Sequence, residues 1–302
     1  MVEIFFLGFR AKVFAAEETF RVVTYNVENY VVDPDAARPM KTQAAKSKVW
    51  ESILVAKPDV LALEEIGSSN ALIEIQGALE ERGLSLPYSE LIQGFDTNIH
   101  VAVLSRFVLD ARNPHTNDSY LLNGQQFYVS RGFAEVEVEV NTNYAFTLLA
   151  AHLKSKRKVG YADESDMRLE EARLLRKHVD ECFDKDKNIN LLVLGDMNDL
   201  RDSKTMRCLI GRGNRALTDT RPGEQDVGNV PTEKNPSARK RPVCWTEYFE
   251  KEDLYSRLDY ILLSRGMARE WIESQSSIPV VHGWGEGSDH RPVVATFHAE
   301  DR

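Results

Sequence analysis

The sequence predicts an α/β fold in which mixed β-sheets are flanked by helices. From Phe20 onward, segments rich in β-branched and aromatic residues alternate with segments of helical periodicity. The same alternation recurs in the second half of the chain. Several connections between consecutive predicted strands are too short for a helical crossover, so we expect antiparallel as well as parallel strand pairs.

The first half is predicted to contain two helices. Gln43 to Lys57 repeats apolar residues on one helical face, and Pro58 stops it. Asn70 to Arg82 shows the same periodicity and is followed by Gly83. The strands predicted here are Phe20 to Tyr25, Asp59 to Leu63, Val101 to Leu104 and Ala134 to Val140. The last of them alternates valine with glutamate, which is typical of a half-solvated strand near a sheet edge.

The second half begins with a predicted strand, Ala145 to Ala151, and a long helix, Asp163 to Phe183. Every residue from Leu191 to Leu194 is apolar, so this strand should be buried on both faces. Arg212 to Arg241 is rich in Gly, Pro and charge and predicts a long loop. Leu258 to Leu263 and Val293 to Phe297 are the final predicted strands.

Composition excludes several classes of protein. The 302 residues carry 38 Lys and Arg against 47 Asp and Glu, a net charge of −9. This charge argues against a protein that coats nucleic acid by bulk attraction, but not against an enzyme that binds phosphate locally through metal ions. Three cysteines exclude a disulfide framework and allow one bridge at most. No apolar stretch approaches the roughly 18 residues of a membrane span.

Polar residues stand at the ends of the predicted strands. Asn26, Glu64 with Glu65, His152, and Asp196 with Asn198 each follow a strand, whereas Asp259 and Ser288-Asp289-His290 come at the start of one. If the last two strands run antiparallel to the others, all these groups converge on one edge of the sheets. Clustered carboxylates repel one another, and a hard divalent cation compensates them. Oxygen ligands favour Mg²⁺ or Mn²⁺ over zinc.

Each of these residues has a structural explanation when taken alone. Asn26 can be a turn residue, Glu64 a solvated loop residue, and His152 a buried hydrogen-bonded histidine. Gly195 to Asp199 can form an Asx turn that enters a helix. Only their joint arrangement points to catalysis.

Six motifs in order resemble one family. They are Tyr25-Asn26-Val27-Glu28-Asn29, Leu63-Glu64-Glu65-Ile66, His152-Leu153-Lys154-Ser155-Lys156, Gly195-Asp196-Met197-Asn198, Arg257-Leu258-Asp259-Tyr260-Ile261-Leu262 and Gly287-Ser288-Asp289-His290-Arg291-Pro292. This set resembles the endonuclease/exonuclease/phosphatase superfamily, which includes DNase I and the abasic-site endonucleases. The resemblance covers about residues 20 to 298. It implies a four-layer α/β/β/α sandwich of two mixed sheets.

The resemblance also implies roles for individual residues. Glu65 is similar to the family's metal-binding glutamate, with Asn26 beside it and Asp289 as a further metal-linked residue. Glu64 stands where relatives often have Gln, so both glutamates remain candidates for the metal. The implied catalytic residues are His152, Asp196, Asn198, Asp259 and His290. The division of acid and base roles stays open.

Within the superfamily, the motif that starts at His152 looks most like secreted nucleases. Arg131 and Arg168 are consistent with the same subgroup, and with Lys154 and Lys156 they are the candidate substrate-binding residues. Lys154 to Lys158 holds four positive charges, and so does Lys234 to Arg241. Each cluster is either a solvated basic loop or part of a groove for a polyanion.

The leading hypothesis is therefore a nuclease that hydrolyses DNA or RNA with Mg²⁺ or Mn²⁺. The first alternative is a phosphatase or phosphodiesterase of small-molecule or lipid substrates, because the superfamily also hydrolyses phosphoinositides and sphingomyelin. A non-enzymatic binding module is disfavoured, because none of the polar groups is missing. We expect a monomer with no stable protein partner.

Residues 20–302 are predicted to form one catalytic domain, preceded by an extension or remnant export signal at 1–19. Ile4 to Phe9 is apolar, and Val13 to Ala16 resembles a cleavage site of small residues. Glu3 precedes the apolar run, and Arg10 and Lys12 place two positive charges directly after it. Export to the periplasm or outside is the favoured location, and the cytoplasm is the alternative.

Overall fold

Two β-sheets packed face to face form the centre of the computed structural model, which describes residues 18–34, 36–226 and 242–302. The first sheet contains β1 (Thr19–Tyr30), β2 (Val60–Ile66), β3 (Tyr88–Ile92), β4 (His100–Ser105) and β17 (Val293–His298), in the order β17-β1-β2-β4-β3. The second contains β5 (Val108–Arg112), β8 (Phe133–Asn141), β9 (Tyr144–His152), β10 (Leu191–Asp196), β11 (Thr218–Asp219) and β15 (Asp259–Leu263), in the order β11-β15-β10-β9-β8-β5.

Each sheet has one parallel pair of strands at its centre, and a helix connects that pair. Helix α1 (Gln43–Ala56) joins β1 to β2, and α3 (Glu164–Lys185) joins β9 to β10. The neighbouring pairs, β17 with β1 and β15 with β10, are antiparallel. The sheets are therefore mixed, as predicted, and the last strands of the chain run opposite to the strands that carry the first motifs.

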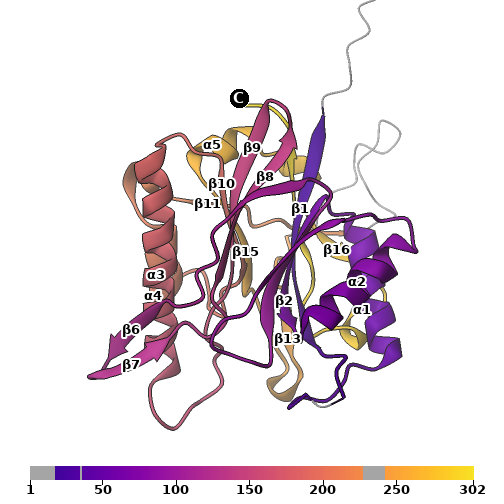
Figure 1. Cartoon of the computed structure of the whole chain (residues 1–302), viewed down its shortest axis with the longest axis vertical. Coiled ribbons are helices and arrows are strands. Elements are labelled where there is room, and N and C mark those ends of the chain that lie inside the picture. The colour runs from indigo at the N-terminus through magenta and orange to yellow at the C-terminus, as the bar shows by residue number, and fades with distance from the viewer. Residues whose placement is uncertain (1–17, 35, 227–241) are drawn as a thin grey trace, which may run out of the picture.

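Four layers follow from the way the apolar side chains divide. One core lies between the sheets and includes Phe20, Val22, Phe146 and Leu194. A second joins the first sheet to α1 and to α2 (Ser69–Glu80), and a third joins the other sheet to α3 and α4 (Lys204–Ile210). Figure 1 shows α1 and α2 on one side of the sheets and α3 and α4 on the other. This is the α/β/β/α sandwich that the resemblance implies.

Local sequence explains where the long helices begin and end. The Thr42 hydroxyl accepts a hydrogen bond from the Ala45 amide and caps α1, which ends at Lys57 in a left-handed conformation before Pro58. Asp163 caps α3 by accepting from the amides of Ser165 and Asp166. Each predicted helix therefore lies within about two residues of its observed bounds.

The remaining elements of the described residues are short. They are the hairpin of β6 (Ser119–Leu122) and β7 (Gln125–Tyr128), β12 (Glu224–Asp226) with β16 (Ile278–Val280), β13 (Glu247–Phe249) with β14 (Leu254–Ser256), α5 (Arg265–Glu270), and four 3-10 turns at Gly213–Arg215, Glu250–Glu252, Glu273–Gln275 and Trp284–Glu286. The sequence does not predict β3, β5, β6 and β7, because these strands have at most five residues and little apolar alternation.

The structure corrects several predictions about strand ends and one about a loop. Glu64 and Glu65 lie within β2 and do not follow it, and His152 and Asp196 are the last residues of β9 and β10. Asn26 does not follow the first strand, because β1 continues to Tyr30 with an irregular register after Asn26. The predicted loop from Arg212 to Arg241 contains a 3-10 turn, β11 and β12, and its residues 227–241 lie outside the described part of the chain. The half-solvated strand at Ala134 to Val140 is confirmed, since Val136 and Val138 are buried and only β5 lies beyond β8.

All three cysteines are free. Among the described residues, no helix combines the length and apolar character needed to cross a bilayer. The predicted export signal falls almost wholly in residues 1–17, outside the described ranges.

Candidate active site

The predicted catalytic groups meet where the central parallel strands of both sheets end. Asn26 is the register partner of Glu64 in the first sheet, and His152 is the partner of Asp196 in the second. Asp259, at the start of antiparallel β15, is also opposite Asp196. The antiparallel direction of the last strands is what brings Asp259 and His290 to this edge, in agreement with the prediction from the strand ends.

Asp196 is the centre of the site. Its Oδ2 accepts hydrogen bonds from Asn26 Nδ2 at 3.0 Å and from Asn198 Nδ2 at 3.2 Å. His152 Nε2 lies 3.5 Å from the same oxygen, and His290 Nε2 lies 3.8 Å from it. Asn26 belongs to the first sheet and Asp196 to the second, so this hydrogen bond spans the interface between the sheets. Burial raises the pKa of Asp196 to about 7, although the His290 charge opposes the shift.

His290 and Asp259 form a buried carboxylate–imidazole pair. His290 Nδ1 is 2.8 Å from Asp259 Oδ2. Burial alone would lower the pKa of His290, but the Asp259 and Asp196 carboxylates outweigh burial and hold this pKa well above its ordinary value. His290 is therefore a cation at neutral pH.

His152 has the opposite electrostatic environment. Burial and the nearby cations Arg131, His290 and Arg38 hold its pKa well below the ordinary value. Its Nδ1 is buried and has no hydrogen-bond partner among the described residues. His152 is therefore neutral, with one N–H to donate to a phosphate oxygen.

The donor set fits a divalent cation. Glu64, Asp196 and Asp259 are three carboxylates with at most 1% of their surface exposed. Glu64 Oε1 accepts from the Thr24 hydroxyl at 2.9 Å, but Glu64 Oε2 and Asp259 Oδ1 are buried without a hydrogen-bond partner among the described residues. Burial and the neighbouring Asp259 charge raise the pKa of Glu64 well above its ordinary value. A bound cation would supply the missing positive charge.

A second group of acidic side chains, Glu28, Glu65 and Asp289, is only partly buried, and we call this more exposed side of the site its mouth. Glu65 Oε2 accepts from the Asn29 amide at 2.9 Å. Burial and the neighbouring Glu65 charge raise the pKa of Asp289, against the opposing charge of His290. Burial and the charge of Asp289 do the same for Glu28. Glu65 and Asp289, the two carboxylates that the resemblance links to metal, therefore lie close to each other, while Glu64 belongs to the inner group.

The backbone is strained around these residues. Glu65 has φ 68° at a bulge where the β2–β4 register shifts, and Glu28, Asn29 and Asn198 also have positive φ. In a regular strand, successive side chains point to opposite faces. The bulge interrupts this alternation and so changes the direction of Glu65 relative to Glu64. Gly195, at φ 129°, brings β10 so close to β9 that a Cβ atom would lie 1.9 Å from the Ala151 carbonyl oxygen.

Three of the four candidate substrate-binding residues are buried. Arg168 donates to the Lys154 carbonyl at 3.0 Å and to Asp199 at 3.2 Å. Arg131 donates to the Leu153 carbonyl at 3.4 Å and lies 3.7 Å from Asp96. Of the cluster from Lys154 to Lys158, Lys154 is only 8% exposed, and its Nζ donates to the carbonyls of Ser155 and Arg157. Lys156, Arg157 and Lys158 are exposed.

Sequence reasoning missed several groups around the mouth. Arg38 and Lys41 line a pocket of about 640 Å³ together with Glu28, Asn29 and Arg157. Lys41 Nζ donates to the Glu28 carbonyl at 2.7 Å, and Arg38 donates to the Asn29 side chain. Both cations come from the segment between β1 and α1, whose sequence carries no periodicity or motif. The second basic cluster, at Lys234 to Arg241, lies outside the described residues.

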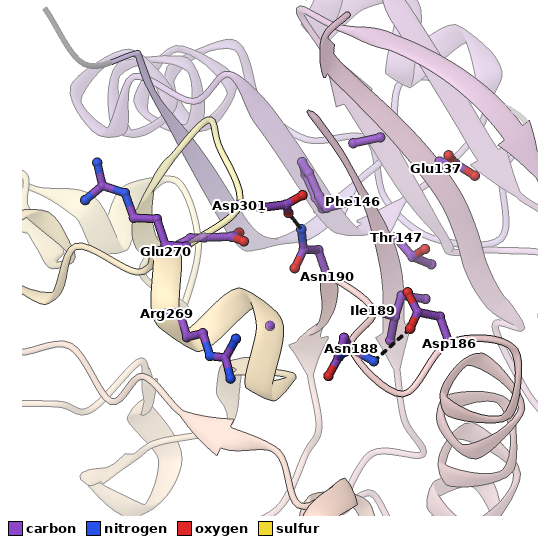
Figure 2. A pocket seen from close by; sticks show the side chains of 13 residues that line it. Glu137, Phe146, Thr147, Asp186, Asn188, Ile189, Asn190, Arg269, Glu270 and Asp301 are labelled. Atoms are coloured by element: carbon purple, nitrogen blue, oxygen red, sulfur yellow. Dashed lines mark hydrogen bonds between the residues drawn. The ribbon is translucent and has the colours of Figure 1, made fainter. Parts of the chain in front are cut away.

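The pocket shown in Figure 2 is a different one. It has a volume of about 480 Å³ and lies at the opposite end of the second sheet, where β9 begins and β10 has not yet started. Asn190, Glu270 and Asp301 line it, and Asn190 Nδ2 donates to Asp301 at 2.7 Å. None of the predicted catalytic residues is among its lining residues.

Comparison with known proteins agrees with this geometry. The model of the Endonuclease/Exonuclease/phosphatase family matches residues 23–290. Truncated TDP2 of Caenorhabditis elegans is 15% identical with a TM-score of 0.59, and the match covers 93% of this chain and 98% of that one. The human Nocturnin catalytic domain is 16% identical (TM-score 0.61; 93% and 96% covered). Sphingomyelinase C from Streptomyces griseocarneus is 18% identical (TM-score 0.59; 93% and 100% covered). At these identities the likeness shows the shared fold. The comparison with curated proteins gives no significant match.

Proposed function

This chain belongs to the endonuclease/exonuclease/phosphatase family and is thus a divalent-metal-dependent hydrolase of phosphoric ester bonds, and we propose that it is a nuclease that cleaves DNA or RNA phosphodiesters with Mg²⁺ or Mn²⁺. The observation that carries the proposal is a rim of exposed cations and aromatic rings beside the buried Asp196 site. Such a rim suits an extended polyanion with bases.

The cationic part of the rim adjoins the catalytic groups. Lys156, Arg157 and Lys158 are exposed and come four to six residues after His152 in the chain. Burial raises the pKa of Glu247, and the positive charges of His290 and Lys156 both oppose this shift. Lys156 and His290 therefore both lie near Glu247. Arg157 lines the same pocket as Arg38 and Lys41. Phosphates on either side of a scissile bond can therefore meet positive charge.

The aromatic part is a stacked pair. The rings of Phe95 and Tyr128 have centroids 5.1 Å apart and an interplanar angle of 12°. They are 68% and 41% exposed. The Asp96 amide donates to the Ser130 carbonyl at 2.6 Å, which ties the two segments together beside Arg131. Exposed rings in such a position offer bases a surface on which to stack.

In the proposed reaction, Asp196 accepts a proton from the attacking water, because its raised pKa of about 7 suits a general base at neutral pH. The charged His290 and the neutral His152 donate hydrogen bonds to the phosphate oxygens, and Asp259 keeps His290 protonated and oriented. Asn26 and Asn198 hold the Asp196 carboxylate through their amide groups. A cation held by Glu65, Asn26 and Asp289, or by Glu64, would act as the Lewis acid on the phosphoryl group.

One observation favours a second candidate, a phosphodiesterase of lipid headgroups. The β6–β7 hairpin projects from the body of the molecule beside α3 (Figure 1) and exposes 73% of Leu121. Together with Phe95 and Tyr128, it forms an apolar edge that can also dip into a lipid surface.

The deciding experiment is a substrate panel of plasmid, single-stranded DNA, RNA, an inositol phosphate and sphingomyelin vesicles, each assayed with Mg²⁺ and with EDTA. We expect cleavage of nucleic acid that needs the metal ion. Activity confined to sphingomyelin or inositol phosphate would support the second candidate, and full activity after EDTA dialysis would contradict a metal-dependent mechanism.

A double variant tests the aromatic rim. Phe95→Ala with Tyr128→Ala should raise KM for single-stranded DNA by about tenfold or more, the scale of one lost base-stacking contact, and leave a short model phosphodiester unaffected. The matched control is Tyr88→Ala, an exposed aromatic residue at the far end of β3. Equal effects of Tyr88→Ala and the double variant would remove the support that the rim gives to a nuclease.

Export of the chain also remains a proposal, supported by the apolar run from Ile4 to Phe9 and the small residues after it. Mass spectrometry of the protein recovered from the periplasm or medium would show a shortened N-terminus if this segment is removed.

A further inference from the structure

A second cluster of metal-ligating side chains lies outside the catalytic site. His115 and Asp118 belong to the segment between β5 and β6, and His178 is on α3. One ligand atom from each of these residues lies within 4.8 Å of the others. The cluster is half-buried, with side-chain exposures of 12%, 24% and 7% for His115, Asp118 and His178, so an ion can reach it.

Each ring nitrogen of His178 faces a carboxylate. Its Nε2 is 2.5 Å from Asp118 Oδ2, and its Nδ1 is 3.2 Å from Glu181 Oε2. A neutral imidazole has one N–H, so one of these two contacts would set a nitrogen lone pair against a carboxylate. The rings of His178 and His115 are also stacked, with centroids 3.6 Å apart at an interplanar angle of 21°.

His115 has a carboxylate partner of its own. Its Nε2 lies 2.7 Å from Glu135 Oε2, on β8. Donation from Nε2 to Glu135 leaves the Nδ1 lone pair free. In the same way, donation from His178 Nδ1 to Glu181 leaves the Nε2 lone pair beside Asp118. Histidines that bind metals usually donate their second ring N–H to a carboxylate, and here both rings have one.

We propose that His115, Asp118 and His178 bind a divalent transition-metal ion of the Zn²⁺ class, with Glu135 and Glu181 orienting the two imidazoles. Two imidazoles and one carboxylate prefer such an ion to Mg²⁺, which favours all-oxygen sites. One ion would accept a lone pair from each ring and would offset the carboxylate charge.

The site would join three parts of the fold. His115 exchanges backbone hydrogen bonds with Phe133 at the start of β8, of 2.9 and 3.1 Å. The Asp118 carbonyl accepts from the Val129 amide at 2.8 Å and so closes the base of the β6–β7 hairpin. An ion shared with His178 would fasten that hairpin to α3, on the flank of the molecule where Figure 1 shows the two side by side.

Calorimetric titration of the full chain with Zn²⁺ tests the proposal. The protein is first stripped with EDTA, dialysed free of it, and kept in excess Mg²⁺ so that the oxygen site is occupied. We expect His115→Gln and His178→Gln each to bind one Zn²⁺ fewer per chain than the wild type. The control His282→Gln replaces an exposed histidine elsewhere and should bind as the wild type does. Equal stoichiometry and affinity in all four proteins would overturn the proposal.

Two further measurements separate metal loss from misfolding. Glu135→Gln keeps all three ligands and should weaken Zn²⁺ binding by about 10- to 100-fold without abolishing it. In the wild-type protein, ring ¹⁵N NMR should show Zn²⁺ shifting His115 Nδ1 and His178 Nε2 and leaving His282 unmoved. If the ring resonances of His115 and His178 do not shift when Zn²⁺ is added, the cluster is a hydrogen-bonded pair of histidines and not a metal site.

Discussion

His152 and His290 lie within 4 Å of the same Asp196 oxygen, yet their pKa values move in opposite directions. Burial is the largest influence on both. What separates them is the sign of the neighbouring charges: cations surround His152, whereas Asp259 and Asp196 face His290. A site with one neutral and one charged imidazole can offer a phosphate two hydrogen-bond donors. Because only one of them is charged, the two rings do not repel each other.

Asp196→Asn tests the central residue. The amide cannot accept the proton of the attacking water, so we expect kcat to fall by at least about a hundredfold. The melting temperature should not fall, because the change removes one of three buried carboxylates. Steady-state rates and thermal unfolding of the variant give both numbers. Asp202→Asn, at an exposed position, is the control, and a large stability loss in Asp196→Asn without a specific rate defect would make Asp196 a structural residue.

At the scale of elements, the ends of β2 and β10 shape the site by departing from regular strand geometry. The bulge at Glu65 turns one of two adjacent glutamates toward Asn29 and the mouth, while Glu64 stays inside. Gly195 lets β10 approach the Ala151 carbonyl immediately before Asp196. Both features cost stability and are placed where a side chain must be aimed.

Gly195→Ala should therefore be strongly destabilising. The added methyl would overlap the Ala151 carbonyl oxygen, and the φ of 129° is unfavourable for alanine. We expect a loss of about 3 kcal/mol or more in the free energy of unfolding, measured by urea denaturation. Gly77→Ala is the matched control, because Gly77 is inside α2 with nothing within 4 Å of the new methyl, and it should be neutral or stabilising by up to about 1 kcal/mol. Similar losses in both variants would contradict the close approach of β10 to β9.

The basic loop after β9 should make the binding of duplex DNA depend on salt. Replacing Lys156, Arg157 and Lys158 together by Ser should flatten the dependence of log KM for duplex DNA on log salt by up to about two to three units, since each phosphate contact contributes about 0.9. Turnover of a short model phosphodiester should stay nearly unchanged. Lys177, Lys185 and Lys187 replaced by Ser remove the same charge elsewhere and serve as the control. An unchanged slope in the first triple variant would identify the loop as solvated and favour the compact-substrate candidate.

At the scale of the whole molecule, the candidate active site lies at the seam between two sheets with the same central parallel pairing. Each sheet supplies the end of its parallel pair, and an Asn26–Asp196 hydrogen bond of 3.0 Å spans the seam. The opposite end of the second sheet, beside α5, holds another buried titratable group. Glu270, which Figure 2 labels, is buried there. Its carboxylate accepts a hydrogen bond from the Tyr144 hydroxyl.

Glu270 should make global stability depend on pH. Burial raises its pKa from 4.5 to about 7, so the folded protein retains a proton that the unfolded chain releases. This stabilisation is complete below pH 4.5 and is lost as the pH rises through about 7. Glu270→Gln should therefore flatten the decline in unfolding free energy between about pH 5 and about pH 8, measured by urea denaturation. Glu252→Gln, at an exposed position, should leave the decline as it is, and a wild-type curve without any decline would contradict the raised pKa.

The sequence by itself determined the alternation of strands and helices, the bounds of the long helices and the set of polar residues at the strand ends. These features are local: apolar periodicity, capping residues and short motifs act over a few positions, so one chain displays them without its fold. The buried core strand at Leu191 to Leu194 and the meeting of Asn26, His152, Asp196, Asp259 and His290 follow from such patterns once the strand directions are known.

Only the tertiary structure decided which charged side chains are exposed and which are buried against other groups. The sequence pattern indicates substrate contacts at Lys154 and Arg168. In the structure the Lys154 ammonium donates to carbonyls of its own loop, whereas Arg168 on α3 is buried against the Lys154 carbonyl and the Asp199 carboxylate. Arg38 and Lys41 belong to no motif, and the cluster of His115, Asp118 and His178 forms only because the fold brings His178 to Asp118, 60 positions away in the chain. A charged residue reads the same in the sequence whether its side chain is exposed or paired. Its role depends on burial and long-range contacts that no short window of sequence contains.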